Sequence, residues 1–171
     1  QYTVLKQFCK LIPPHVVTEL AVRHGVADRS RTFTPWSHTL SLLFAHLTHA
    51  VGLNDVCDAL QMNEGVVRTL RGAQAPSRNT LSHANRVRDC AMAEELFWRV
   101  QEHLVKTTPN FVTGSARRGY LRRFRTAIHA VDSSTIQLVA NCMDWAKHRR
   151  RKAAAKCHLR LNLQSFLPQY V

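Results

Sequence analysis

The sequence predicts an α+β fold, in which a helical N-terminal part precedes the first strands of a sheet. From residue 3 to about 107 the apolar residues recur at helical spacing, and from residue 127 they run together or alternate as in strands. The charge changes with this pattern. Residues 1–112 carry 12 Lys and Arg and 9 Asp and Glu, a net +3, whereas residues 113–171 carry 12 and 2, a net +10. We therefore expect a helical domain at 1–112, a basic connector at 113–125 and the start of a strand-rich domain at 126–171.

Prolines and caps mark the first two long helices. Pro13 and Pro14 predict the start of a helix that runs to His24, where Gly25 stops it. Thr34 is the expected cap of the next helix, because a first-turn proline follows it. That helix gathers one apolar stripe, which we expect to face the core, and Gly52 is expected to end it. The stripe consists of Trp36, Leu40, Leu43, Leu47 and Val51.

Shorter capped helices follow. Asn54, Asn63 and Ser77 are side chains that commonly cap helices, and they predict helices at 54–60, 64–71 and 77–88. A further helix at 93–106 returns to an ordinary core pattern.

The helix at 77–88 is unusually polar, which is typical of a helix that faces solvent or DNA. It follows two short capped helices, and this order resembles a helix-turn-helix, whose second helix presents Arg and Asn to base edges. The alternative is an ordinary helical hairpin, which is common in any all-α domain. The candidate DNA contacts on this helix are Arg78, Asn79, Asn85, Arg86 and Arg88.

Three strands are expected in the second half. The run Ala127–Val131 is nearly all apolar and suits a strand buried on both faces. Residues 135–140 alternate, and residues 155–163 alternate strictly between apolar and polar side chains. A small sheet with one polar face needs a cover, from the helical half or from further sequence.

The net charge of +13 and the isoelectric point near 10.5 favour a nucleic-acid partner, because neutralised phosphates release condensed counterions. The expected partner is double-stranded DNA. A solvated charged helix is the alternative for residues 147–156, but seven basic residues without an acidic neighbour would repel one another. The candidate DNA contacts here are Arg117, Arg118, Arg122, Arg123, Arg125, Lys147, Arg149, Arg150, Arg151, Lys152, Lys156, His158 and Arg160.

Two other readings of the charge have less support. A basic membrane-surface helix would need a long apolar stripe beside the arginines, and no run approaches the roughly 18 apolar residues of a membrane span. An RNA-binding domain would need aromatic side chains arranged on strands as a stacking platform. We expect a soluble, cytoplasmic protein, and the N-terminus reads as an internal start without a signal peptide.

Asp132 follows the first expected strand and stands among basic segments. Enzymes that act on phosphodiesters hold Mg²⁺ through fixed carboxylates while Lys and Arg gather the polyanion. Asp132 is therefore the candidate metal ligand and catalytic residue. Its alternative is a turn residue, since Asp-Ser-Ser is good turn chemistry. Only Asp144 joins it as a carboxylate after residue 112, so a site with two or three acidic ligands is not complete.

The remaining Cys and His residues have structural explanations. Five cysteines are scattered without metal-ligand spacing, and most are expected to be reduced core thiols. His46 and His49 are three residues apart but lack a third ligand nearby, so we expect core or surface histidines.

Five segments, in this order, resemble DDE transposases of the IS-four insertion-sequence type. Each segment is weak alone, and the ordered set is specific because it spans most of the chain. The segments are Phe33-Thr-Pro-Trp-Ser-His38, Leu53-Asn-Asp-Val-Cys-Asp-Ala-Leu60, Ser77-Arg-Asn-Thr-Leu-Ser-His-Ala-Asn85, Ala130-Val-Asp-Ser-Ser-Thr-Ile-Gln-Leu138 and Trp145-Ala-Lys-His-Arg-Arg-Arg-Lys-Ala-Ala-Ala-Lys-Cys-His158.

The resemblance implies a helical domain that engages transposon-end DNA and a ribonuclease-H-like catalytic domain, of which this chain holds the first three strands. Asp132 matches the first Asp of a triad that holds two Mg²⁺ or Mn²⁺ ions for attack on a DNA phosphodiester. The second Asp and the Glu are expected beyond Val171, so the chain alone is expected to be inactive. A further partner that we consider is a second copy of the chain, in a homodimer on the DNA. A stand-alone DNA-binding protein, as a transposase remnant or a repressor of transposition, is the competing hypothesis.

Overall fold

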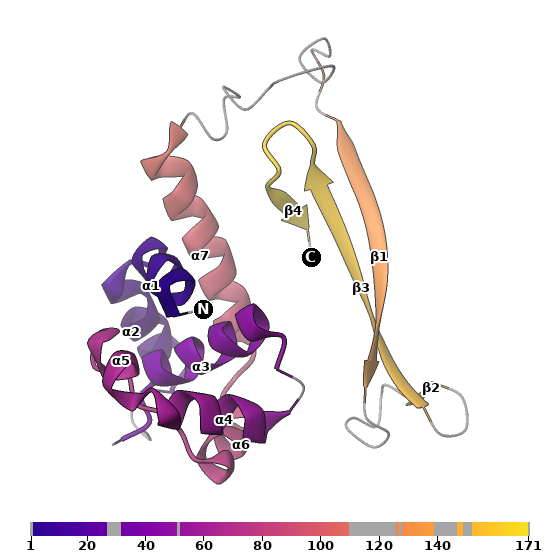
Figure 1. The fold of residues 1–171 in the computed structure, drawn as a ribbon. Coiled ribbons are helices and arrows are strands. Elements are labelled where there is room, and N and C mark those ends of the chain that lie inside the picture. The colour runs from indigo at the N-terminus through magenta and orange to yellow at the C-terminus, as the bar shows by residue number, and fades with distance from the viewer. Residues whose placement is uncertain are drawn as a thin grey trace. The chain divides into compact units, whose positions relative to one another are not determined.

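The computed structural model describes residues 2–26, 32–50, 52–109, 126, 128–138, 147–148 and 152–170, with the backbone alone at 135–138, 147–148 and 152–155. The chain forms two compact units, Gln1–Leu104 and Val105–Val171. Seven helices in the described residues precede an antiparallel sheet (Figure 1), which confirms the predicted α+β class.

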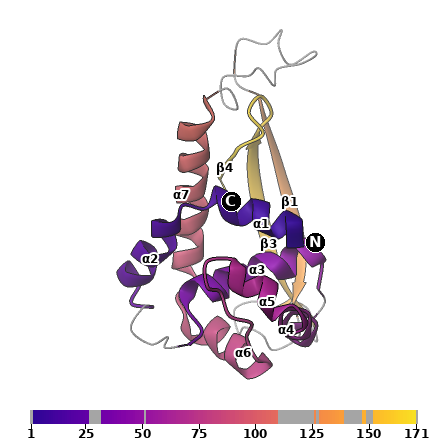
Figure 2. The ribbon, with the colours of Figure 1, turned by 60° about the vertical axis from the view of Figure 1, so that its left-hand side comes forward.

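The helices are α1 (Tyr2–Leu11), α2 (Pro14–Arg23), α3 (Pro35–Thr48), α4 (Leu53–Met62), α5 (Glu64–Thr69), α6 (Arg78–Val87) and α7 (Ala91–Thr107). Figure 2 shows the same elements from a second direction. Two predicted caps are confirmed, because Thr34 Oγ1 accepts from the Ser37 amide at 3.1 Å and Ser77 Oγ accepts from the Thr80 amide at 3.2 Å. Gly25, with φ +63°, follows α2 as predicted.

The predicted boundary around Gly52 was wrong. Helix α3 already ends at Thr48, where His49 takes the left-handed conformation, and Gly52 is instead the N-cap of α4. Its amide donates to Asp55 Oδ2 at 3.0 Å, so Asn54 lies inside the helix that it was expected to cap. Asn63 does precede α5, but its side chain donates backwards to the Ala59 carbonyl.

The buried face of α3 is centred differently from the predicted stripe. Leu40 and Phe44 are in the core, but so are two serines, Ser37 and Ser41. Both serines are satisfied: Ser41 donates to the Ser37 carbonyl at 2.8 Å, and the Gln74 amide donates to Ser37 Oγ at 3.0 Å. Small hydrogen-bonded side chains let the loop before α6 approach the helix. The predicted stripe residues Trp36, Leu43 and Leu47 are half-buried at its edges, and Val51 lies outside the described residues.

Two hydrophobic clusters form the core of the first unit. One joins α1, α3, α4, α5 and α6, and the other joins α2 to the start of α7. Trp36 and Leu43 pack against both clusters. Trp36 Nε1 donates to the Leu70 carbonyl at 2.8 Å, and the Arg71 guanidinium lies 4.8 Å from the indole centroid, so this side chain ties the clusters together.

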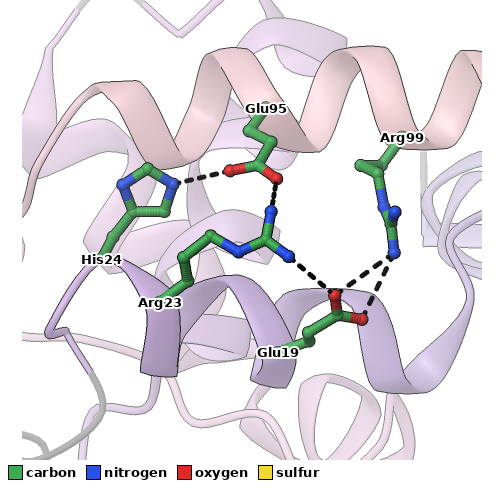
Figure 3. A network of polar contacts seen from close by, with 5 residues as sticks. All are labelled: Glu19, Arg23, His24, Glu95 and Arg99. Atoms are coloured by element: carbon green, nitrogen blue, oxygen red, sulfur yellow. Dashed lines mark hydrogen bonds and ion pairs between the residues drawn. The ribbon is translucent and has the colours of Figure 1, made fainter.

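A polar network fastens α2 to α7 (Figure 3). Glu95 lies between the Arg23 guanidinium and His24 Nε2, and the latter contact is 2.9 Å. Glu19 accepts from Arg23 and from Arg99 at 3.2–3.4 Å. The hydrogen bond from His24, together with the nearby arginines, lowers the pKa of the Glu95 carboxyl.

Of the four cysteines that the structure describes, two lie in the core as expected and two do not. Cys9 and Cys57 are free and buried, and burial raises the pKa of both thiols. Cys90 is exposed, Cys157 is half-buried, and Cys142 lies outside the described residues. No described helix has the length and apolar character to cross a membrane.

In the described residues of the second unit the sheet has four strands: β1 (His129–Leu138), β2 (Lys147–His148), β3 (Lys152–Asn162) and β4 (Pro168–Tyr170). All pairings are antiparallel, and β3 pairs with each of the other three strands. Strand β3 covers most of the predicted 155–163.

The prediction for the first strand was wrong in two respects. The described parts of the two strands expected at 127–131 and 135–140 form one strand, β1, because β3 pairs with it continuously from Asn162 to Ala153. Residues 127, 139 and 140 lie outside the described residues. Val131 is 75% exposed, so this segment is not buried on both faces. Asp132 consequently lies within a strand, and Ser133 and Ser134 continue that strand instead of forming a turn.

Candidate nucleic-acid interface

The outer face of α6 is the first candidate surface. Its inner side is anchored by Leu81 and Ala84, both buried, and its N-terminus is capped by Ser77. The side chains on the outer face are exposed: Arg78, Asn79, Ser82, His83, Asn85 and Arg86. A capped helix with such a face can present several hydrogen-bonding side chains to a nucleic acid at once.

The side chain of Asn85 already makes a hydrogen bond within the protein. Its Oδ1 lies 2.7 Å from His38 Nε2. Burial lowers the pKa of His38, and the Arg88 charge lowers it further, although the bond to Asn85 opposes them. A neutral His38 donates through Nε2, so the Asn85 amide nitrogen is left as the group that can donate outward. Bidentate recognition of adenine needs both the oxygen and the nitrogen of an Asn amide. Asn85 as placed here is therefore suited to an acceptor such as a phosphate oxygen.

Arg88 has an intramolecular role. Its guanidinium donates to the carbonyls of Phe33 and Thr34 and lies 5.3 Å from the centroid of the Phe33 ring. Burial lowers its pKa. Arg88 thus fastens the end of α6 to the segment that leads into α3, and we leave it out of the proposed DNA surface.

A hollow lies beside α6, with a volume of about 720 Å³. Asn79 and His83 line it from α6, and His24 and Phe33 line it from the segments around α2 and α3. Asn79 therefore borders this hollow. Arg86 does not line it, but its guanidinium lies 3.3 Å from Nδ1 of His83, which does. The sequence did not predict this hollow or the place of His83 in it, because sequence periodicity does not show which segment lies opposite a helix.

The second candidate surface is one face of the β1–β3 pair. Lys156, His158 and Arg160 alternate along β3, and all three are exposed. Side chains of directly opposed residues in an antiparallel pair share a face. The register pairs the three basic residues with Thr135, Ser133 and Val131, so these positions form one face of the sheet. We call it the basic face.

Asp132 lies on the opposite face. It pairs with Leu159, and its face is shared by Cys157 and Leu161, which are half-buried. Asp132 is exposed, and its Oδ1 accepts from the Ser133 amide at 2.8 Å. The structure therefore does not bring Asp132 together with the basic residues of β3.

The residues present do not by themselves complete a metal centre around Asp132. Within the part of the chain that the structure describes, no three His, Cys, Asp or Glu side chains are grouped as metal ligands. A single carboxylate leaves Mg²⁺ largely hydrated and weakly held.

The other predicted contacts are not placed as side chains. Lys147 lies in β2 and Lys152 in β3, where only the backbone is described. The remaining basic candidates lie outside the described residues: Arg117, Arg118, Arg122, Arg123, Arg125, Arg149, Arg150 and Arg151.

The comparison with known proteins reaches neither of these two candidate surfaces. Residues 1–68 match the model of a family described as a domain of unknown function, DUF4372. The match covers α1 to α4 and most of α5, and it stops before α6 and the sheet. No curated protein and no solved structure matches the chain. The shown similarity is thus between the N-terminal helices of this chain and a domain family of unknown function.

Proposed function

We propose that this chain is the N-terminal part of a DDE transposase of the IS-four type, and that it binds double-stranded transposon-end DNA. The observation that carries the DNA-binding part is the basic face, where Lys156, His158 and Arg160 are exposed side by side. The described positions of this face hold no Asp or Glu. Surface cations without acidic partners favour a polyanion.

The α6 surface supplies the second part of the proposal. Arg78 and Asn79 are exposed in the first turn of a capped helix, and the N-terminal residues of a recognition helix are those that contact base edges. We assign sequence-specific contacts to α6 and sequence-independent backbone contacts to the second unit. The connector arginines at 117–125 and the basic segment at 147–152 extend this second contact on sequence grounds.

The catalytic part of the proposal rests on the resemblance of the segment around Asp132 to the first Asp of a triad. In a ribonuclease-H-like domain, Mg²⁺ or Mn²⁺ ions held by such a triad stabilise the charge that develops during attack on the phosphodiester. Asp132 would contribute one ligand, and the other carboxylates would come from the rest of a full-length enzyme. We place the protein in the bacterial cytoplasm, associated with the nucleoid.

Duplex binding and strand nicking together test this proposal. The 171-residue chain is titrated with labelled random duplex at increasing salt, and it is then incubated with duplex in Mg²⁺ or Mn²⁺. Salt-dependent binding without nicking by this chain is the result that the proposal expects. Absence of duplex binding at low salt would refute the proposal.

A stand-alone DNA-binding protein is the second candidate function. It is favoured by the absence, among the residues that the structure describes, of any group of three potential metal ligands that includes Asp132. The effect of Asp132→Asn distinguishes the two candidates. A stand-alone binding protein would compete with an active transposase for end DNA and would lose no function in the variant, whereas in a transposase the variant loses nicking in the longer chain.

A further inference from the structure

We propose that the basic face binds a DNA backbone segment other than the one presented to Asp132. This inference rests on the proposed function, because it takes Asp132 to be the residue at which cleavage would occur. The observation behind it is the register of β1 against β3, which separates the two groups onto opposite faces.

The basic face is suited to a phosphodiester backbone. Its three basic residues are two positions apart along β3, which spaces them by roughly 6.8 Å. Ser133, exposed and paired with His158, adds a hydroxyl donor between them. Arg160 Nη2 lies 3.3 Å from His129 Nδ1, and the exposed Tyr170 of β4 pairs with Arg160. Two cations, Lys156 and Arg160, with a histidine and a hydroxyl between them can contact a phosphodiester backbone without reading bases.

The opposite face has a different character. Around Asp132 it carries Leu159 and Leu161, which are half-buried, and apolar faces of this kind normally receive a covering element. A phosphate held by Lys156 or Arg160 is separated from Asp132 by the sheet itself. Adjacent phosphates of one strand therefore cannot contact both groups, so the basic face holds flanking or separate DNA while Asp132 faces another segment.

Two neighbouring serines provide the two positions at which this inference can be tested. Ser133 and Ser134 are both exposed, and they point to opposite faces because they are consecutive in β1. A photocrosslinking amino acid is placed at one or the other position of the 171-residue chain. Each variant is irradiated with a short labelled duplex and, in a parallel arm, with its single strand. The yield from position 133 should exceed that from position 134 by about tenfold in whichever arm binds, since only position 133 lies on the basic face.

Charge removal supplies the second readout. Replacing Lys156 and Arg160 together by Gln should abolish the crosslink from position 133 and reduce the salt slope of binding by roughly two, at about 0.9 per phosphate contact. The matched control removes the same charge from α1 through Lys6→Gln and Lys10→Gln, two exposed residues, and should leave the crosslink intact. Equal or stronger crosslinking from position 134, or bound DNA that does not crosslink from 133, would overturn the inference while DNA binding stands. Absence of DNA binding by the unmodified chain would overturn the proposed function as well.

Discussion

Positive charge alone does not identify a DNA contact, as Arg88 illustrates. Its sequence position beside Arg86 predicts a surface contact, yet its guanidinium is occupied by two carbonyls and the Phe33 ring. The two arginines differ in what surrounds them in three dimensions. Sequence patterns give the side of a helix on which a residue lies, but not whether a neighbouring segment reaches it.

Arg78 is the residue on which base-specific binding should depend. It is exposed in the first turn of α6, and a good bidentate contact contributes about 1–3 kcal/mol of discrimination. Arg78→Ala should weaken binding to a cognate end, selected from a random duplex pool, more than binding to random duplex. Arg68→Ala, which removes an exposed arginine from α5, is the control. Equal losses on both DNAs would reduce Arg78 to a backbone contact.

Acid should destabilise the helical unit in two steps. Burial lowers the pKa of His38, so the unfolded chain binds a proton that the folded chain excludes, and stability falls as the pH drops below about 6.5. The pKa of Glu95 is lowered chiefly by the His24 hydrogen bond. The stability that Glu95 contributes is therefore fully present above the pKa of this group in the unfolded chain, and it is lost as the pH falls through the pKa in the folded chain. Urea midpoints measured across pH report both losses of stability.

His38→Gln should reduce the fall of the urea midpoint in the first step, and Glu95→Gln should reduce it in the second. A pH profile that is unchanged in either variant would contradict the assignment of that step.

At the level of helices and strands, helix caps were predictable where the residue is one that chiefly caps the N-terminus of a helix. Thr34 followed by Pro35, and Ser77 before a polar helix, fixed two starts correctly. Gly52, Asn54 and Asn63 misled because Gly and Asn occur at both ends of helices and in the turns between them. The choice among them was decided by Asp55, whose carboxylate holds the Gly52 amide.

The two confirmed caps should each stabilise the helical unit measurably. Thr34→Ala or Ser77→Ala removes the acceptor of a first-turn amide and should cost about 1 kcal/mol. Ser82→Ala is the matched control, because Ser82 lies exposed within α6 and alanine is the better helix former there. Urea unfolding of the three variants tests this, and a Ser77→Ala loss no larger than that of Ser82→Ala would show that the cap contributes little.

Strand faces were only half predictable. Alternation within β3 correctly grouped Lys156, His158 and Arg160, because side chains two apart share a face. Whether Asp132 joined them depended on the register against β1, and a shift of one residue would move Asp132 to the other face. Nothing local in either strand specifies that register, so the separation of Asp132 from the basic face emerged only from the structure.

The distribution of charge along the whole chain predicts where binding energy arises. Residues 113–171 carry a net +10, so most of the salt dependence should come from the second half. Replacing Arg122, Arg123 and Arg125 together by Ala should lower the salt slope of duplex binding by roughly two to three, at about 0.9 per contact. An unchanged slope in an ionic-strength titration would remove the connector from the phosphate contacts.

A substitution at Asp132 should distinguish DNA binding from DNA cleavage. One carboxylate holds a hydrated Mg²⁺ weakly, and a two-metal mechanism needs bridging ligands from elsewhere in the fold. We therefore expect the 171-residue chain to bind duplex DNA without nicking it in Mg²⁺ or Mn²⁺. In a longer chain that supplies the other carboxylates, Asp132→Asn should abolish nicking and leave DNA binding intact, since Asn keeps the size of the side chain but loses the charge that holds the ion. Strand nicking on an end-sequence duplex, with Ser134→Ala as the control on the same face, measures this. Metal-dependent nicking by the 171-residue chain that survives Asp132→Asn would show that the reacting phosphate is activated somewhere other than at Asp132.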